Sequence, residues 1–135
     1  MPKRQIRVLV VDDSITARKM ILGLCRKLGF ADITEVDRAD AALIKLIIES
    51  NFGLILCDWN MPGASGIDLL SSIKSNALIK HIPFVFVTAE SEPRHIEAAR
   101  KMGADEFLTK PIDTQKFANI IEKIVVPVAA NARAA

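Results

Sequence analysis

The chain has 135 residues, of which 50% are hydrophobic and 25% are charged, and its formal net charge is +2. This composition is typical of one globular domain that buries a core of its own. The two cysteines, Cys25 and Cys57, form no CxxC pair and have no histidine cluster beside them, which argues against a disulfide framework and against a zinc site. The basic residues are dispersed, so direct nucleic-acid binding is not expected.

The first apolar run, residues 8–11, is too short for a signal peptide or a membrane span, so we expect a cytoplasmic protein without membrane insertion. This run is the first expected strand. A stripe of apolar residues with helical spacing follows over 17–28, and Gly29 marks the end of that helix. The next expected strand, residues 33–36, is more polar than the first, which is typical of a strand at the edge of a sheet.

The same alternation continues to the end of the chain. Helical spacing returns over 42–47, 67–73, 96–102 and 117–124, and the apolar runs between these segments are 54–57, 84–87 and the weaker 107–108. Pro127 is expected to end the last helix. The sequence is therefore divided into one domain, residues 1–126, and a flexible tail, residues 127–135.

Strict alternation of five strands and five helices with short connections predicts an α/β fold. The expected architecture is a doubly wound, five-stranded parallel sheet with helices on both faces and right-handed crossovers. Nearly continuous apolar strands support this prediction, because a parallel strand is covered on both faces.

Polar residues stand at the carboxyl ends of four of these strands. The first strand ends at Asp12 and Asp13, the third at Asp58, the fourth at Thr88 and the fifth at Lys110. Parallel strands end at the same edge of a sheet, and ligands of open α/β sheets bind there. We therefore expect these five side chains to form one site.

Three carboxylates at one edge require a counter-charge. Two unit charges about 4 Å apart repel by roughly 4 kcal/mol at an effective dielectric constant near 20. Lys110 offsets one charge, and a single divalent cation would neutralise the rest. Hard carboxylate oxygens without Cys or His ligands favour Mg²⁺. The two histidines, His81 and His95, lie away from the strand ends and are expected at the surface.

A Mg²⁺ ion beside Lys110 and Thr88 suits phosphoryl groups, because all three stabilise negatively charged oxygens during transfer. No Ser, Cys or His stands at a strand end with a base beside it. The expected nucleophile is therefore a carboxylate, and the expected product is an acyl phosphate. The chemistry of the residues leaves Asp12, Asp13 and Asp58 as candidates for this nucleophile.

Four segments, VLVVDDS, LILCDWNMPGASG, FVFVTAES and FLTKPID, resemble a bacterial response-regulator receiver domain in their order and spacing. The resemblance covers all of the chain except its C-terminal tail. It implies the flavodoxin-like strand order 2-1-3-4-5. It also implies that Asp58 is the phosphoacceptor, and that Asp12, Asp13, Asp58 and the backbone carbonyl of Asn60 hold Mg²⁺.

The resemblance assigns further roles to residues around the acceptor. Lys110 and Thr88 would contact the phosphoryl oxygens, and the peptide bond Lys110-Pro111 would be cis. Thr88 and Phe107 would act as the switch that carries the signal to the surface of the fourth helix, fifth strand and fifth helix. Asn60 and Glu90 stand at positions that tune dephosphorylation, and their types imply fairly rapid loss of phosphate.

Taken as a whole, the resemblance implies a phosphorylation-activated response regulator of a two-component system. A sensor histidine kinase or a phosphotransfer protein would supply the phosphoryl group, and a downstream protein would bind the switch surface. The expected state is a monomer or a weak dimer that depends on phosphorylation. The segments DWNMP and RKLGF are most similar to those of stand-alone chemotaxis regulators, although Phe107 replaces the tyrosine of the flagellar-motor regulator. Such a protein catalyses only its own phosphotransfer and dephosphorylation.

Three other interpretations remain open at this stage. The chain could be a receiver domain cut from a larger multidomain regulator. It could be a phosphohydrolase with an aspartate nucleophile, although Asn60 stands where such enzymes generally carry a second Asp as general acid and base, and an amide cannot transfer that proton. It could also be a binding module whose signalling does not depend on phosphate.

Overall fold

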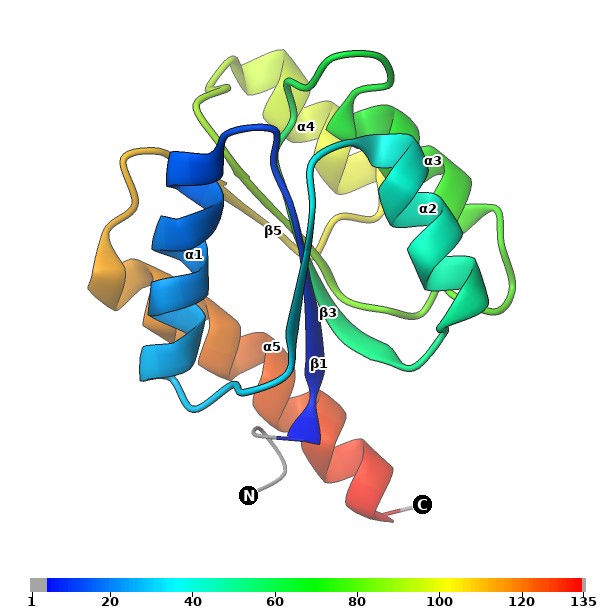
Figure 1. Ribbon diagram of the computed structural model, residues 1–135, viewed down its shortest axis with the longest axis vertical. Coiled ribbons are helices and arrows are strands. Elements are labelled where there is room, and N and C mark those ends of the chain that lie inside the picture. The colour runs from blue at the N-terminus through cyan, green and yellow to red at the C-terminus, as the bar shows by residue number, and fades with distance from the viewer. Residues whose placement is uncertain (1–4, 135) are drawn as a thin grey trace.

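The computed structural model describes residues 5–134, with side chains described as far as Val125. Five parallel strands form one sheet in the order β2-β1-β3-β4-β5, which confirms the predicted fold and strand order (Figure 1). The strands are β1 (Arg7–Val11), β2 (Ile33–Val36), β3 (Phe52–Cys57), β4 (Phe84–Thr88) and β5 (Glu106–Thr109). The helices are α1 (Ile15–Lys27), α2 (Ala39–Ile48), α3 (Gly66–Lys74), α4 (Pro93–Met102) and α5 (Thr114–Ala134).

The sheet separates two hydrophobic cores. Helices α1 and α5 cover one face, and α2, α3 and α4 cover the other (Figure 1). The residues of strand β1 alternate between the two cores. Val8 and Val10 pack toward α1 and α5, while Leu9 and Val11 pack toward the opposite helices. All four side chains are fully buried. The near-continuous apolar strands are therefore the result of two covered faces.

Strand β2 lies at the edge of the sheet, as its polarity predicted. All four of its residues are partly exposed, and each pairs only with β1. The weakest predicted strand, residues 107–108, is longer in the structure because Glu106 and Thr109 also pair with β4. Their polar side chains gave no apolar signal in the sequence.

The helices that follow the strands begin with residues suited to their first turn. The hydroxyl of Ser14 accepts the Ala17 N–H at the start of α1. Ser65 and Asp68 form a capping box at the start of α3, and Pro93 occupies the first turn of α4. These helix starts lie at the carboxyl edge of the sheet, so they fix the loops that carry the polar residues.

The predicted end of the last helix at Pro127 was wrong. Helix α5 extends from Thr114 to Ala134. Proline removes one backbone donor from a helix, but the sequence after Pro127 is rich in alanine, the residue with the highest helix propensity. The predicted flexible tail over 127–135 includes Ala135, which lies outside the described residues, and stays a prediction. Within the described part of the chain, no helix combines the length and the apolar character needed to cross a membrane.

Candidate functional site

The three predicted aspartates meet at the carboxyl edge of the sheet. Asp12 and Asp13 follow β1, and Asp58 follows the neighbouring strand β3, where its N–H donates to the Val11 carbonyl at 2.9 Å. One carboxylate oxygen from each of the three lies within 4.8 Å of the others. Asp12 and Asp58 are buried, while Asp13 is exposed. The prediction that the three aspartates meet at this edge is confirmed.

Lys110 brings a positive charge from β5 to the aspartates. Its Nζ lies 2.8 Å from Oδ2 of Asp12 and 3.6 Å from Oδ2 of Asp58. Burial acts to lower the pKa of Lys110, but the hydrogen bond that its ammonium donates to Asp12 and the charge of Asp58 outweigh this effect, and the net pKa is raised. The amine is therefore charged at neutral pH. The Lys110-Pro111 peptide is cis, in agreement with the resemblance.

Asp12 is fixed on several sides. Its Oδ1 accepts the backbone N–H of Ser14 at 2.9 Å, and its Oδ2 accepts from Lys110. The guanidinium of Arg18 donates to its main-chain carbonyl at 2.7 Å. A carboxylate with this many donors is firmly placed, and these hydrogen bonds compensate for the burial of a side chain that is only 1% exposed.

Asp58 has fewer partners. Its closest donors are the N–H of Asn60, 3.4 Å from Oδ1, and the more distant Lys110. The loop that follows is shaped by two glycines: Gly63 has a φ of 80°, and Gly66 packs directly on the Asp58 backbone. A Cβ on Gly66 would overlap the Asp58 carbonyl oxygen. The Gly66 N–H also donates to the Trp59 carbonyl at 2.8 Å, which closes the loop.

Thr88 ends β4, the strand next to β3, which Asp58 follows. Its side chain is fully buried, and Oγ1 accepts the N–H of Glu90 at 3.2 Å. Its main-chain carbonyl accepts the Lys110 N–H at 2.7 Å, which holds the last residue of β4 against the residue that follows β5. The hydroxyl proton of Thr88 can therefore be donated to an acceptor other than Glu90.

Phe107 packs against aromatic side chains next to the acidic residues. Its partly buried ring packs 5.4 Å from Phe86 and 6.2 Å from Trp59, measured between ring centroids. It also lines a hollow of about 180 Å³ between α4 and β5, together with Ile96 and Arg100. Phe107 thus connects the aromatic side chains beside Asp58 with the outer surface.

The donor set fits Mg²⁺. Asp12, Asp13 and Asp58 provide hard, anionic oxygens that lie close together, and they include no Cys or His ligand. Asn60 lies two residues beyond Asp58 on the same loop and is exposed. Lys110 offsets one of three negative charges, so a divalent cation matches the remainder.

His95 lies closer to this site than its sequence position indicated. It was expected at the surface away from the strand ends, but its ring stacks on Trp59 with centroids 5.0 Å apart and an interplanar angle of 22°. The available signal was its position in the first turn of α4, directly after β4, because helices that follow parallel strands begin at the edge where ligands bind. His81 is exposed, as expected.

Comparison with known proteins agrees with this geometry. The model of the response regulator receiver domain matches residues 8–122. The chain is 39% identical over 119 residues to chemotaxis protein CheY of Pseudomonas aeruginosa, which covers 88% of this chain and 95% of that protein. It is 34% identical over 121 residues to chemotaxis protein CheY-3 of Vibrio cholerae, with 90% and 92% covered.

Solved structures give the same result. The structure of chemotaxis protein CheY4 of Vibrio cholerae superimposes with a TM-score of 0.80 at 25% sequence identity, and the match covers 88% of this chain and 98% of that one. The strand order, the acidic edge and the sequence matches therefore lead to one conclusion. The chain belongs to the response regulator receiver domain family.

Proposed function

We propose that this protein is a phosphorylation-activated response regulator that accepts a phosphoryl group on Asp58. The observation that supports Asp58 most is the distribution of partners among the three aspartates. Both carboxylate oxygens of Asp12 already accept hydrogen bonds, one from the Ser14 N–H and one from Lys110, and Asp13 is exposed. Asp58 stands at the end of the central strand β3 with only longer contacts to its carboxylate, so its oxygen is available for attack.

The proposed reaction needs no proton transfer by Asp58. Its carboxylate oxygen attacks the phosphorus of a phosphohistidine, an O–P bond forms, and the N–P bond of the donor breaks. The donor imidazole leaves with the electron pair and takes up a proton from solvent. The Lys110 ammonium lies near the attacking carboxylate and stabilises the phosphoryl oxygens electrostatically.

Mg²⁺ is the proposed cofactor. Asp12, Asp13, Asp58 and the backbone carbonyl of Asn60 would hold it, and when bound it neutralises negative charge on the carboxylates and the phosphoryl group. Asn60 and Glu90 are proposed to tune the rate of dephosphorylation. Of these two, Asn60 is exposed and Glu90 is partly buried, so Asn60 is the more accessible to water that approaches Asp58.

The proposed switch uses Thr88 and Phe107. The Thr88 hydroxyl would donate to a phosphoryl oxygen on Asp58, and this movement would disturb its present contact with the Glu90 N–H. Phe107 would then repack against Phe86 and Trp59 and change the hollow between α4 and β5. Only a partner that binds the phosphorylated and unphosphorylated states with different affinities would respond to this change.

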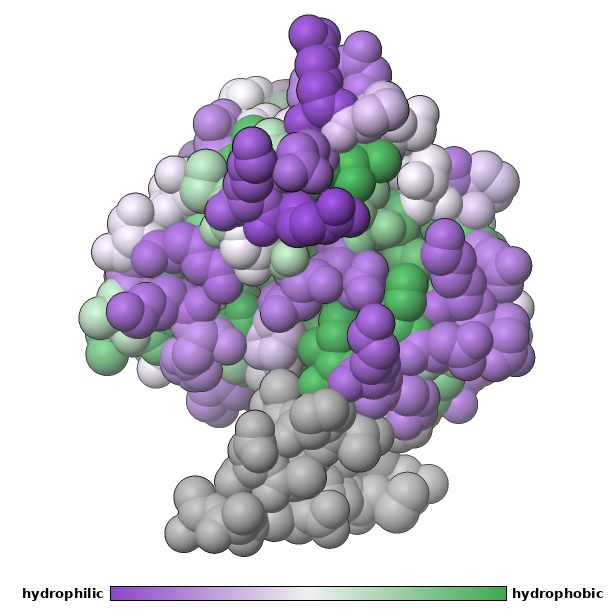
Figure 2. Space-filling view, turned by 180° about the vertical axis from the view of Figure 1, so that it is seen from behind, coloured by the Kyte–Doolittle hydropathy of each residue, from purple (hydrophilic) through white to green (hydrophobic). Residues whose placement is uncertain are grey.

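The proposed partners are a sensor histidine kinase or a phosphotransfer protein on the input side, and a target protein that binds the α4-β5-α5 surface. Figure 2 shows the molecule turned by 180° from the view of Figure 1. This face carries apolar patches among hydrophilic side chains, which suits reversible binding. Chemotaxis is the proposed pathway because the relatives described above are chemotaxis proteins. We propose a cytoplasmic location, and a monomer or a weak dimer that forms on phosphorylation.

Phosphate labelling tests the acceptor. The wild-type protein and Asp58→Asn are incubated with a radiolabelled small phosphodonor and Mg²⁺, and acid-labile protein-bound phosphate is measured. We expect labelling of the wild type and none of the variant. Undiminished labelling of Asp58→Asn would show that another residue is the acceptor, and multiple turnover of a phosphate ester would favour the phosphohydrolase.

A binding measurement tests the signalling role. A candidate target protein is titrated with the regulator in the presence and absence of beryllofluoride, which mimics the phosphoryl group on an aspartate. We expect tighter binding with beryllofluoride. Equal binding in both conditions would favour the binding module that does not depend on phosphate.

A further inference from the structure

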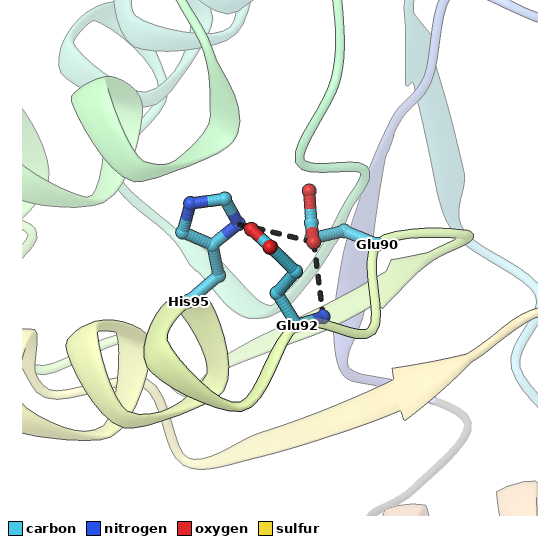
Figure 3. Close-up of side chains that lie close together, drawn as sticks. All are labelled: Glu90, Glu92 and His95. Atoms are coloured by element: carbon cyan, nitrogen blue, oxygen red, sulfur yellow. Dashed lines mark hydrogen bonds and ion pairs between the residues drawn. The ribbon is translucent and has the colours of Figure 1, made fainter.

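Glu90, Glu92 and His95 form a second cluster of metal-ligating side chains, separate from the three aspartates (Figure 3). The cluster lies where the loop after β4 enters α4. The Nδ1 atom of His95 is 3.0 Å from Oε2 of Glu90 and 3.5 Å from Oε2 of Glu92. Nothing in the proposed phosphotransfer uses this group of side chains together.

The state of the His95 ring indicates a ligand. Its Nδ1 is shielded from solvent, yet it makes no hydrogen bond of acceptable geometry within the described part of the chain. Its closest polar neighbours are the carboxylates of Glu90 and Glu92, which can pair with this nitrogen only if it carries a proton or if a cation lies between them. Stacking on Trp59 holds the ring in this orientation. A buried polar atom of this kind normally has a partner, which can be an ion.

We propose that Glu90, Glu92 and His95 form a binding site for a divalent transition-metal ion of the Zn²⁺ class. Imidazole nitrogen with carboxylate oxygen suits such ions, whereas Mg²⁺ prefers oxygen ligands alone. Two ligands that each lie about 2.1 Å from a tetrahedral ion are about 3.4 Å apart. The observed distances from Nδ1, 3.0 and 3.5 Å, are on either side of this value.

The charge of the site is also suitable. The backbone N–H of Glu92 and the neighbouring His95 lower the pKa of Glu90, so its carboxylate is ionised at neutral pH. Arg94 is the competing cation, because its Nε lies 3.2 Å from Oε2 of Glu92. The Arg94 side chain is 78% exposed, so an incoming ion displaces it at little cost.

The position of the site gives the ion a defined structural effect. Glu90 and His95 belong to the loop and to the helix, respectively, so an ion held by both would fasten the loop to α4. The Glu90 N–H donates to the Thr88 hydroxyl, and Trp59 contacts the His95 ring. Binding at this site is therefore expected to change the fluorescence of Trp59, the only tryptophan in the chain.

Titration with Co²⁺ alone tests the site, with Trp59 fluorescence as the signal and excess Mg²⁺ present to occupy the aspartates. We expect saturable quenching in the wild type and an affinity at least about 10-fold weaker in His95→Asn and Glu90→Gln. His81→Asn removes the other, exposed histidine and should leave the affinity unchanged. Arg94→Gln should strengthen binding.

The variants also distinguish the two metal sites. If quenching is retained in His95→Asn but weakened in Asp13→Asn, Co²⁺ occupies the aspartates and the proposal is wrong. Absence of quenching in the wild type would overturn it too, and would leave a proton as the partner of His95. Glu92→Gln provides a variant at an exposed position if His95→Asn does not fold, and circular dichroism checks the fold of each.

An NMR measurement identifies the ligand atom independently of fluorescence. Long-range ¹H–¹⁵N spectra of the histidine rings are recorded while Zn²⁺ is added in the presence of Mg²⁺. We expect the Nδ1 resonance of His95 to shift to the range of a metal-bound nitrogen, and the His81 ring to stay unchanged. A shift at Nε2 of His95, or none, would contradict the proposed geometry.

Discussion

The ammonium group of Lys110 forms an ion pair of 2.8 Å with the carboxylate of Asp12, although the two residues are 98 positions apart in the chain. Asp12 is almost fully buried, and a carboxylate oxygen of Asp58 lies 3.6 Å from the same amine. Lys110 therefore compensates the negative charge of the acidic site before any phosphoryl group arrives. We therefore expect its removal to affect stability as well as the proposed phosphotransfer.

We predict that Lys110→Met lowers the free energy of unfolding by about 1 to 3 kcal/mol in metal-free buffer, because it leaves a buried carboxylate without its partner. Added Mg²⁺ should recover part of this loss by replacing the missing positive charge. Urea unfolding with a chelator and with Mg²⁺ measures both effects. Lys123→Met is the matched control, since Lys123 pairs with Glu106 at an exposed position, and its change should stay within about 0.5 kcal/mol. An equal loss for Lys110→Met in both buffers would contradict the explanation.

The carboxylate of Asp13 is expected to lower the stability of the metal-free protein but to strengthen its binding of Mg²⁺. Its exposed carboxylate adds negative charge within 4.8 Å of Asp12 and Asp58. We predict that Asp13→Asn raises the free energy of unfolding without metal by up to about 1 kcal/mol, because repulsion across the site decreases. The same change should weaken Mg²⁺ binding about 10-fold, measured by titration of Trp59 fluorescence. Lower stability of Asp13→Asn in metal-free buffer would show that Asp13 has a structural role instead.

The main features of the fold could be predicted from the sequence because the three central strands, β1, β3 and β4, are buried on both faces. Val8 to Val11 and Leu54 to Cys57 are apolar throughout, and an acidic residue stops each run at the edge where ligands bind. The same rule placed Asp12, Asp13, Asp58, Thr88 and Lys110 in one site. This rule could not predict which of the carboxylates has the fewest close partners. That difference depends on the Lys110 ammonium, which lies closer to Asp12 than to Asp58.

The position of His95 shows a second limit of the sequence. Its environment depends on the path of the loop after β4 and on the ring of Trp59, which comes from a different strand end. The end of α5 shows a third limit, since Pro127 predicted a helix end and the helix continues past it to Ala134. In both cases a local pattern was overruled by neighbours, in space for His95 and along the chain for Pro127.

Gly66 is predicted to be essential to the loop after Asp58. A Cβ at this position would overlap the Asp58 carbonyl and approach the Phe86 ring to 2.8 Å, and both neighbours are buried. We expect Gly66→Ala to lower the free energy of unfolding by about 2 kcal/mol or more, since a packed core cannot move aside. Gly23→Ala is the matched control: nothing lies within 4 Å of its Cβ position in α1, so the change should stabilise the helix by about 0.5 to 1 kcal/mol. Thermal and urea unfolding of both variants measure the difference, and similar effects of the two would disprove the close approach.

The Cys25 thiol is predicted to make stability fall at alkaline pH. Burial raises its pKa to about 12, whereas a thiol in an unfolded chain has a pKa of about 8.5. The folded state holds the proton more tightly, so this contribution is complete below about pH 8.5 and is lost as the pH rises toward 12. Within this range, the free energy of unfolding should fall by about 1.4 kcal/mol per pH unit for this group. Urea unfolding of the wild type and Cys25→Ala between pH 7 and about pH 10 isolates it, because the other groups titrate in both proteins. We expect a smaller decrease for Cys25→Ala, despite its lower stability at neutral pH, and parallel curves would show that Cys25 does not carry the effect.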